Sequence, residues 1–119
     1  MSVGVALAAM SLVLGLVPVP ARAVAPTVVA TANFRYLPGE VIVIEGGSVT
    51  LANLEHASHD VTADETTATG APIFASQSIG QGTTPVVGVE DLDPGVYTFF
   101  CTVHPSMLGL LNVQEAPAG

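Results

Sequence analysis

The sequence predicts an all-β fold, a β-sandwich of two sheets with Greek-key connections and about eight strands. Short runs rich in Val, Ile, Thr, Tyr and Phe recur along residues 27–113, and clusters of Gly, Pro and Asp separate them. No segment in this range repeats its apolar residues at the 3.6-residue spacing of a helix. Many short strands joined by turns at regular intervals are typical of a sandwich.

Each predicted strand is bounded by residues that favour turns. Gly46-Gly47 follows one β-branched run, and Pro94-Gly95 precedes another. A polar stretch without periodicity is expected to form a loop, and the last five residues a tail. The expected strands are 27–34, 41–44, 49–54, 85–90, 96–101 and 108–113, with a further short strand and turn over 73–82, and the expected turns and loops are 35–39, 64–72 and 91–95.

The strand expected at 96–101 leads directly into the only cysteine of the chain. Because side chains alternate along a strand, Tyr97, Phe99 and Cys101 share one face. Two large aromatic side chains on that face indicate that it packs in the core, with the thiol buried beside them. Pro94-Gly95 before Tyr97 resembles a tyrosine corner, in which the phenol bonds back to the preceding turn. Tyr97 is therefore expected to have a structural role.

Three soft metal donors lie within seven residues, because Cys101, His104 and Met107 are each separated by two residues. Copper sites that transfer single electrons have two His, one Cys and one Met as ligands. Their donors are therefore two imidazoles, a thiolate and a weak thioether. The alternative is a buried structural cysteine beside an unrelated His and Met. A copper site needs a second imidazole, and only His56 and His59 remain to supply it.

Two motifs resemble those of the cupredoxins, the blue copper proteins. The segment Asn53-x-Glu55-x-x-x-His59-x-Val61 resembles the family motif that carries the first histidine ligand. The short spacing of the second motif, which begins at Cys101, is similar to that of the amicyanins within this family. The resemblance extends over residues 34–113 and implies a plastocyanin-like sandwich that binds one copper ion.

The resemblance also implies which residues ligate copper. In the family pattern, Asn or Asp and then Val follow the first ligand, and His59 fits this pattern whereas His56 does not. An isolated His in a loop is usually solvated, and His56 is expected to be so. The implied type 1 copper ligands are therefore His59, Cys101 and His104 in a plane, with Met107 weak and axial.

Asn53 and Asp60 are the residues expected to support the ligands. Family members often have Asn at the position of Asp60, and its amide can tie the two ligand loops together. An ionised carboxylate can only accept hydrogen bonds. We therefore expect Asp60, next to an anionic thiolate, to turn outward or to be protonated.

The surface near His104 is expected to bind redox partners. The resemblance implies that the far ring edge of His104 reaches solvent, with Pro105, Met107 and Leu108 in an apolar rim that suits brief docking. Leu110, in the same strand as Leu108, is expected in the core. We expect a monomer that exchanges electrons with a donor and an acceptor protein.

The charge of the chain is strongly acidic. Ten Asp and Glu residues face two Arg residues, and Lys is absent. Without residues 1–23, Arg35 alone opposes ten negative charges, and the net charge is −9. Such a surface repels nucleic acid and anionic lipid and favours a partner with a basic face, although simple solubility explains it equally well.

The first 23 residues resemble a signal peptide. Residues 3–17 are apolar and uncharged, and Ala21-Arg22-Ala23 is a small-residue site that predicts cleavage after Ala23. The mature chain is then a single domain, 24–119, in the periplasm, at the cell surface or outside the cell. The alternative is an uncleaved membrane anchor over residues 2–21. A lone cysteine in an exported chain forms no internal disulfide, which favours its use as a metal ligand.

Three other functions compete with the secreted electron carrier. A copper storage or delivery protein would carry Met- or His-rich tracts with exposed ligands, which this chain lacks. A zinc hydrolase would need a general base that no motif supplies. A copper oxidase would need an open coordination position, and four side-chain ligands leave none. The sequence therefore predicts a protein that is not an enzyme, with copper storage or delivery as the alternative function.

Overall fold

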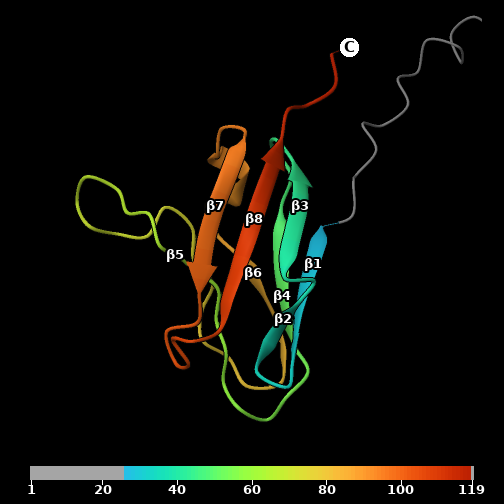
Figure 1. Ribbon diagram of the computed structural model, residues 1–119, viewed down its shortest axis with the longest axis vertical. Helices are drawn as coiled ribbons and strands as arrows, with labels where there is room; N and C mark the ends of the chain where they lie inside the picture. The colour runs from blue at the N-terminus through green and yellow to red at the C-terminus, as the bar shows by residue number, and fades with distance from the viewer. Residues whose placement is uncertain (1–25, 119) are drawn as a thin grey trace, which may run out of the picture.

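Two four-stranded sheets pack face to face in the computed structural model, which describes residues 26–118 (Figure 1). The strand order is β2-β1-β4-β6 in the first sheet and β3-β8-β7-β5 in the second sheet. This arrangement confirms the all-β sandwich of eight strands. The strands are β1 Thr27–Ala32, β2 Arg35–Leu37, β3 Glu40–Ile44, β4 Val49–Asn53, β5 Thr62–Ala63, β6 Gly82–Val86, β7 Gly95–Phe100 and β8 Leu108–Gln114, and a 3₁₀ turn, η1, covers Val89–Asp91.

The alternation of side chains places one face of each sheet in the core. In β3, Val41 and Val43 are buried while Ile42 and Ile44 point outward. The two sheets meet through such inward residues, and β1 pairs with β4, and β3 with β8, in parallel register. The remaining strand pairs are antiparallel. Strands from distant parts of the sequence thereby enclose one core.

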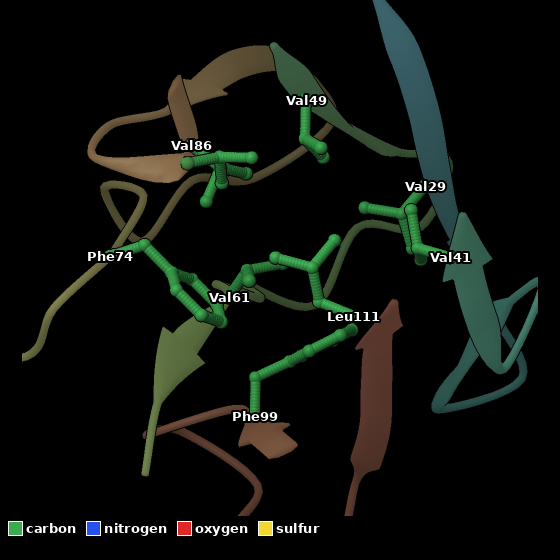
Figure 2. Close-up of a pocket in the computed structure, with 9 residues that line it drawn as sticks. Val29, Val41, Val49, Val61, Phe74, Val86, Phe99 and Leu111 are labelled. Atoms are coloured by element: carbon green, nitrogen blue, oxygen red, sulfur yellow. The ribbon is translucent and has the colours of Figure 1, made fainter. Parts of the chain in front are cut away.

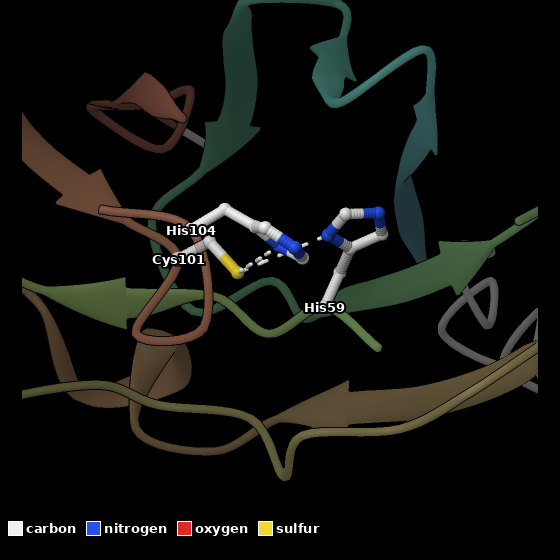
Figure 3. Close-up of side chains that lie close together, drawn as sticks. All are labelled: His59, Cys101 and His104. Carbon is white, nitrogen blue, oxygen red and sulfur yellow. Dashed lines mark hydrogen bonds between the residues drawn. The ribbon is translucent and has the colours of Figure 1, made fainter. Parts of the chain in front are cut away.

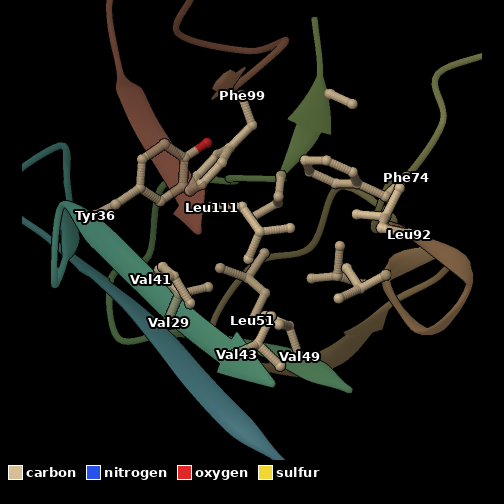
Figure 4. Packing of buried hydrophobic residues seen from close by; sticks show 14 of the residues in the cluster. Val29, Tyr36, Val41, Val43, Val49, Leu51, Phe74, Leu92, Phe99 and Leu111 are labelled. Carbon is tan, nitrogen blue, oxygen red and sulfur yellow. The ribbon is translucent and has the colours of Figure 1, made fainter. Parts of the chain in front are cut away.

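The core is filled almost completely. Aromatic rings of Phe74 and Phe99 lie beside Leu111 and valines from both sheets, and the space that they enclose is about 10 Å³ (Figure 2). One water molecule needs about 10–15 Å³ by the same measure. The ring of Tyr36 packs edge-on against Phe99, with centroids 4.8 Å apart, at the periphery of this cluster (Figure 4). Protein interiors that leave so little empty space resist deformation.

Some strands differ from the sequence prediction. The first strand ends at Ala32 because Asn33 and Phe34 have positive φ angles of 53° and 57°, which turn the chain. Residues 35–37 then form β2, where the sequence predicted only a turn. The interior position of Tyr36, between the exposed Arg35 and Leu37, gives β2 the alternation of a strand.

The strand predicted at 85–90 is shifted toward the N-terminus. It covers Gly82–Val86 and is followed by η1, because Gly88 has a left-handed φ of 104° that ends the extended chain. The short strand predicted within 73–82 forms only isolated bridges, such as Ala75 to Val87. Thr62–Ala63, which pairs with β7, was not predicted as a strand.

Leu110 lies on the outer face of the second sheet, and its predicted core position is wrong. Gly109, Leu111 and Val113 point inward, while Leu108 and Leu110 are 68% and 39% exposed. The ring of Phe99 fills the space above Gly109, its partner across the β7–β8 pair. An inward glycine at 109 fixes the alternation and sends Leu110 outward.

The predicted signal segment, 1–23, lies outside the described residues. Between residues 26 and 118, no helix is long and apolar enough to span a bilayer. The tyrosine corner predicted at the start of β7 is present, because Tyr97 Oη donates to the carbonyl of Asp93 at 2.6 Å. Burial raises the pKa of the Tyr97 hydroxyl, and the nearby Asp93 and Glu65 raise it further.

Gly109→Ala is expected to lower the free energy of unfolding by about 1–3 kcal/mol, the usual cost of overpacking a core. A Cβ atom at Gly109 would lie 2.4 Å from Cζ of Phe99. Denaturant unfolding measures the loss, and Gly39→Ala is the control, because a Cβ there meets no atom within 4 Å. If Phe99→Leu does not reduce the cost of Gly109→Ala, the clash is not its cause.

Candidate metal centre

Three potential metal ligands converge at the lower end of the sandwich in Figure 1, where the β4–β5 connection meets the β7–β8 loop. Donor atoms of His59, Cys101 and His104 all lie within 4.8 Å of one another (Figure 3). Nδ1 of each histidine is 3.9 Å from Sγ of Cys101. His59 and Cys101 are completely buried, and His104 is half-buried. The sequence predicted each of these three residues as a ligand.

The β7–β8 loop brings its two other donors back toward Cys101. The Cys101 N–H donates to the carbonyl of Met107 at 3.2 Å, and the Met107 N–H donates to the carbonyl of His104 at 2.8 Å. These bonds close the loop within seven residues. The side chain of Met107 is buried, as a weak axial ligand requires, whereas Pro105 is exposed.

Asn53 holds the loop that carries His59, the supporting role expected for it. Its amide donates to the carbonyls of Ala57 at 2.8 Å and Ile79 at 2.9 Å. Its Oδ1 accepts from the Glu55 N–H and the Thr31 hydroxyl, both at 2.9 Å. With Asn53 buried, these four bonds fix the chain between β4 and His59. The backbone of His59 also exchanges two hydrogen bonds of 3.0 Å with Ile79.

Glu55 determines which ring nitrogen of His59 faces the other donors. Nε2 of His59 lies 2.5 Å from a carboxylate oxygen of Glu55. Since an ionised carboxylate only accepts, Nε2 donates to Glu55, and Nδ1 is the ring nitrogen that faces Cys101. Partial desolvation raises the pKa of the Glu55 carboxyl, but hydrogen bonds from His59 and the Phe34 backbone outweigh it and leave this pKa below its usual range.

Asp60 is buried and points inward, so the first of the two expected outcomes, an outward orientation, is wrong, and the second, protonation, stays a prediction. Oδ1 accepts from the Thr102 N–H at 3.0 Å and the Thr62 hydroxyl at 2.9 Å, and Oδ2 accepts from the Thr102 hydroxyl. Three donors compensate the burial of the carboxylate. Because Asp60 follows His59 and Thr102 follows Cys101, the carboxylate ties the two ligand loops together as an acceptor.

Tyr36 supports the same loop from β2. Its hydroxyl donates to the backbone carbonyl of Asp60. Burial raises the pKa of this hydroxyl well above its usual value, and the nearby thiol of Cys101 and carboxylate of Asp60 raise it further. The phenol therefore stays protonated and keeps its hydrogen bond. In the described chain, every buried side-chain nitrogen and oxygen has a hydrogen-bond partner.

Sequence reasoning assigned no role to several residues around the donors. Glu55 belonged to the quoted motif, and its spacing of four residues from His59 was the available signal. Phe34 lies edge-on to both imidazoles, with its ring centroid 4.8 Å from that of His104. No sequence pattern indicated a role for Thr102 or Tyr36, because each of them hydrogen-bonds to a residue far away in the sequence. His56 is exposed and lies outside the donor cluster.

The protein family follows from this chain's match to a family model. The model described as copper binding proteins of the plastocyanin/azurin family matches residues 23–114. The chain belongs to this cupredoxin family. No curated protein sequence matches this cupredoxin.

Solved structures of amicyanins are similar to this cupredoxin. A Cu(I) form of an amicyanin variant is 27% identical, covers 77% of this chain and 85% of its own, and has a TM-score of 0.65. The oxidised state of another variant is 26% identical, covers 75% and 82%, and has a TM-score of 0.63. A copper-containing nitrite reductase from Thermus scotoductus SA-01 is 22% identical over 77% of this chain and 23% of its own, with a TM-score of 0.62. That match shows the fold alone.

The cluster of His59, Cys101, His104 and Met107 in this cupredoxin is a type 1 copper site. The donor set suits copper, because a soft thiolate and a thioether accompany two imidazoles. The orientation of His59 also fits, since its Nε2 faces Glu55 and its Nδ1 faces Cys101. Copper is thus the cofactor that both the sequence and the geometry of the site indicate.

Replacement of His56 by Ala and replacement of His59 by Ala are expected to have different effects on the copper spectrum. His59→Ala removes a buried donor and should abolish the type 1 copper spectrum, while His56→Ala removes only an exposed ring and should leave it unchanged. Visible absorption and electron paramagnetic resonance after addition of Cu(II) measure the difference. A normal spectrum in His59→Ala, with a loss in His56→Ala, would contradict the ligand assignment.

Proposed function

We propose that this cupredoxin is an exported carrier that moves single electrons between two redox proteins. The observation that supports this proposal most is the burial of the donors inside a network of hydrogen bonds. Bound copper supplies the Cu(I)/Cu(II) couple. Because Asp60 and Asn53 fix the loops, the donors keep one arrangement in both oxidation states, which lowers the reorganisation that accompanies electron transfer. The similar amicyanins are described in both oxidised and Cu(I) forms.

Burial of the ligands argues against copper storage or delivery. His59 and Cys101 are inaccessible, and the side chain of Met107 is also buried. A protein that passes its metal to a partner needs accessible, labile ligands, and here only His104 is partly exposed. Four side-chain ligands also leave no open position for a substrate. We therefore propose a carrier and not an enzyme.

The proposed route for electrons passes through His104, the one ligand that reaches the surface. Pro105 is exposed beside it, and Leu108, across the loop, is the most exposed large apolar side chain described. An apolar rim without charge permits close but brief contact with a partner. We propose that donor and acceptor proteins dock at this rim and that the carrier acts as a monomer.

The acidic charge supports two further parts of the proposal. A net charge of −9 for residues 24–119 favours partners with a basic face and disfavours nucleic acid. A separate feature, the signal-like segment 1–23, supports the export that we propose, with the carrier in the periplasm, at the cell surface or outside the cell. If this segment is not cleaved, it would hold the carrier at a membrane.

Cys101→Ser is expected to abolish the intense blue colour of the copper protein, because a hydroxyl cannot replace the covalent thiolate bond to copper. Visible absorption of wild type and variant with added Cu(II) tests this.

In the wild type, electron exchange with a small redox protein should also be much faster than loss of copper to a chelator. Copper loss at a rate similar to electron exchange would favour the delivery function.

Leu108→Asp is expected to slow electron exchange with a small basic redox protein about tenfold at every salt concentration, the effect of roughly 1.4 kcal/mol. Val96→Asp is the matched control, since Val96 is also exposed but lies at the opposite end of β7. Exchange by the wild type should slow as salt rises, because salt screens charges beyond about 8 Å. Equal effects of the two variants would place docking elsewhere.

A further inference from the structure

One carboxylate contacts the surroundings of both imidazole ligands. Glu55 accepts the Nε2–H of His59 at 2.5 Å, and each of its oxygens also lies 3.3 Å from the backbone nitrogen of Phe34. Its side chain is 19% exposed, so water screens these bonds only in part. Glu55 therefore joins the loop that carries His59 to the turn between β1 and β2.

That turn is held in an unfavourable conformation. Asn33 and Phe34 both have positive φ angles, and such angles are rare for a bulky residue like Phe. Phe34 also leaves half of its ring exposed. Strained residues persist where neighbouring groups hold them, and they often occur at functional sites. The contact of Glu55 with the Phe34 N–H is one such restraint.

The strained turn places the Phe34 ring against the copper ligands. Its centroid lies 4.8 Å from the ring of His104 and 5.5 Å from that of His59, at interplanar angles of 80° and 87°. Edge-to-face contacts of this kind are favourable. His104 is the least buried ligand, and the Phe34 ring limits the space into which its imidazole can turn.

We propose that Glu55 is a positioning residue for both imidazole ligands. It orients His59 directly through Nε2, and it orients His104 indirectly by holding the turn that carries the Phe34 ring. This inference rests on the proposed type 1 copper function and adds a coupling between its two histidines. No other described carboxylate hydrogen-bonds to an imidazole in this structure.

Glu55→Gln separates the two contacts, because an amide has only one acceptor. If the Gln oxygen accepts from His59, the NH₂ group replaces the other of the two oxygens that face the Phe34 N–H, so the restraint on the turn is weakened. Cu(II) affinity is expected to fall about tenfold or more, the usual cost of mutating a partner of a ligating His. Glu45→Gln is the matched control, since Glu45 is exposed and lies at the other end of the sandwich.

Nuclear magnetic resonance of the Cu(I) protein distinguishes positioning from a general loss of stability. The wild type should show a slowly exchanging His59 Nε2 proton and a nuclear Overhauser contact between Phe34 and His104. In Glu55→Gln the contact should weaken, while the resonances of the distant core stay unchanged. A full Phe34–His104 contact in this variant, or a Cu(II) affinity equal to that of wild type, would overturn the proposal.

Phe34→Leu tests the indirect half of the coupling without touching Glu55. Copper loss from the Cu(I) form to a chelator should accelerate in Phe34→Leu and in Glu55→Gln. If Glu55 acts on His104 through Phe34, the two effects combine to less than their product in the double variant. Effects that multiply fully would overturn the indirect half.

Glu55→Asp and the colour of the wild-type protein with Cu(II) provide two further controls. If Glu55→Gln does not fold, Glu55→Asp replaces it, because the shorter carboxylate can reach only one of the two partners. Wild-type protein that stays colourless with Cu(II) would overturn the proposed function itself. Blue wild type with unaltered variants would overturn only the coupling.

Discussion

The buried carboxylate of Asp60 connects the two chain segments on which the copper ligands lie. One segment runs from β4 in the first sheet to β5 in the second sheet, and the other follows β7, the strand that pairs with β5. Asp60 accepts the N–H and the hydroxyl of Thr102, so the residue after His59 is bound to the residue after Cys101. The separation of the donors depends on this link together with the short β5–β7 pairing, in which Thr62 lies opposite Phe100.

A polar network at one end of an apolar core makes this link rigid. Asn53 and Tyr36 hydrogen-bond to the backbone of the loop that carries His59. Backbone hydrogen bonds within the β7–β8 loop hold the segment that begins at Cys101. Phe99, two residues before Cys101, is part of the densely packed interior (Figure 4). A displacement of the thiol would therefore disturb both the hydrogen bonds of the network and the packing of the core.

The sequence was sufficient for the fold class and, through its resemblance to the cupredoxins, for the four copper ligands, because the motifs that carry both predictions are local. Alternation of apolar residues predicts strands, and the spacing of Cys101, His104 and Met107 identifies one ligand loop. Local patterns failed where a distant partner decides the outcome. Asp60 points inward because Thr102 and Thr62 satisfy its carboxylate. Leu108, Leu110 and Leu111 are all apolar, so their pattern could not show which face is buried.

The lengths of the edge strands have a consequence for how copies of this protein meet at high concentration. Exposed strand edges can pair between molecules and begin aggregation. The edge strands β2 and β5 have only three and two residues, and β6 contains Pro85, which lacks an N–H. The remaining edge, β3, begins at Glu40 and is followed by Glu45. In a chain without lysine, these like charges repel a second copy at the one five-residue edge strand that contains no proline.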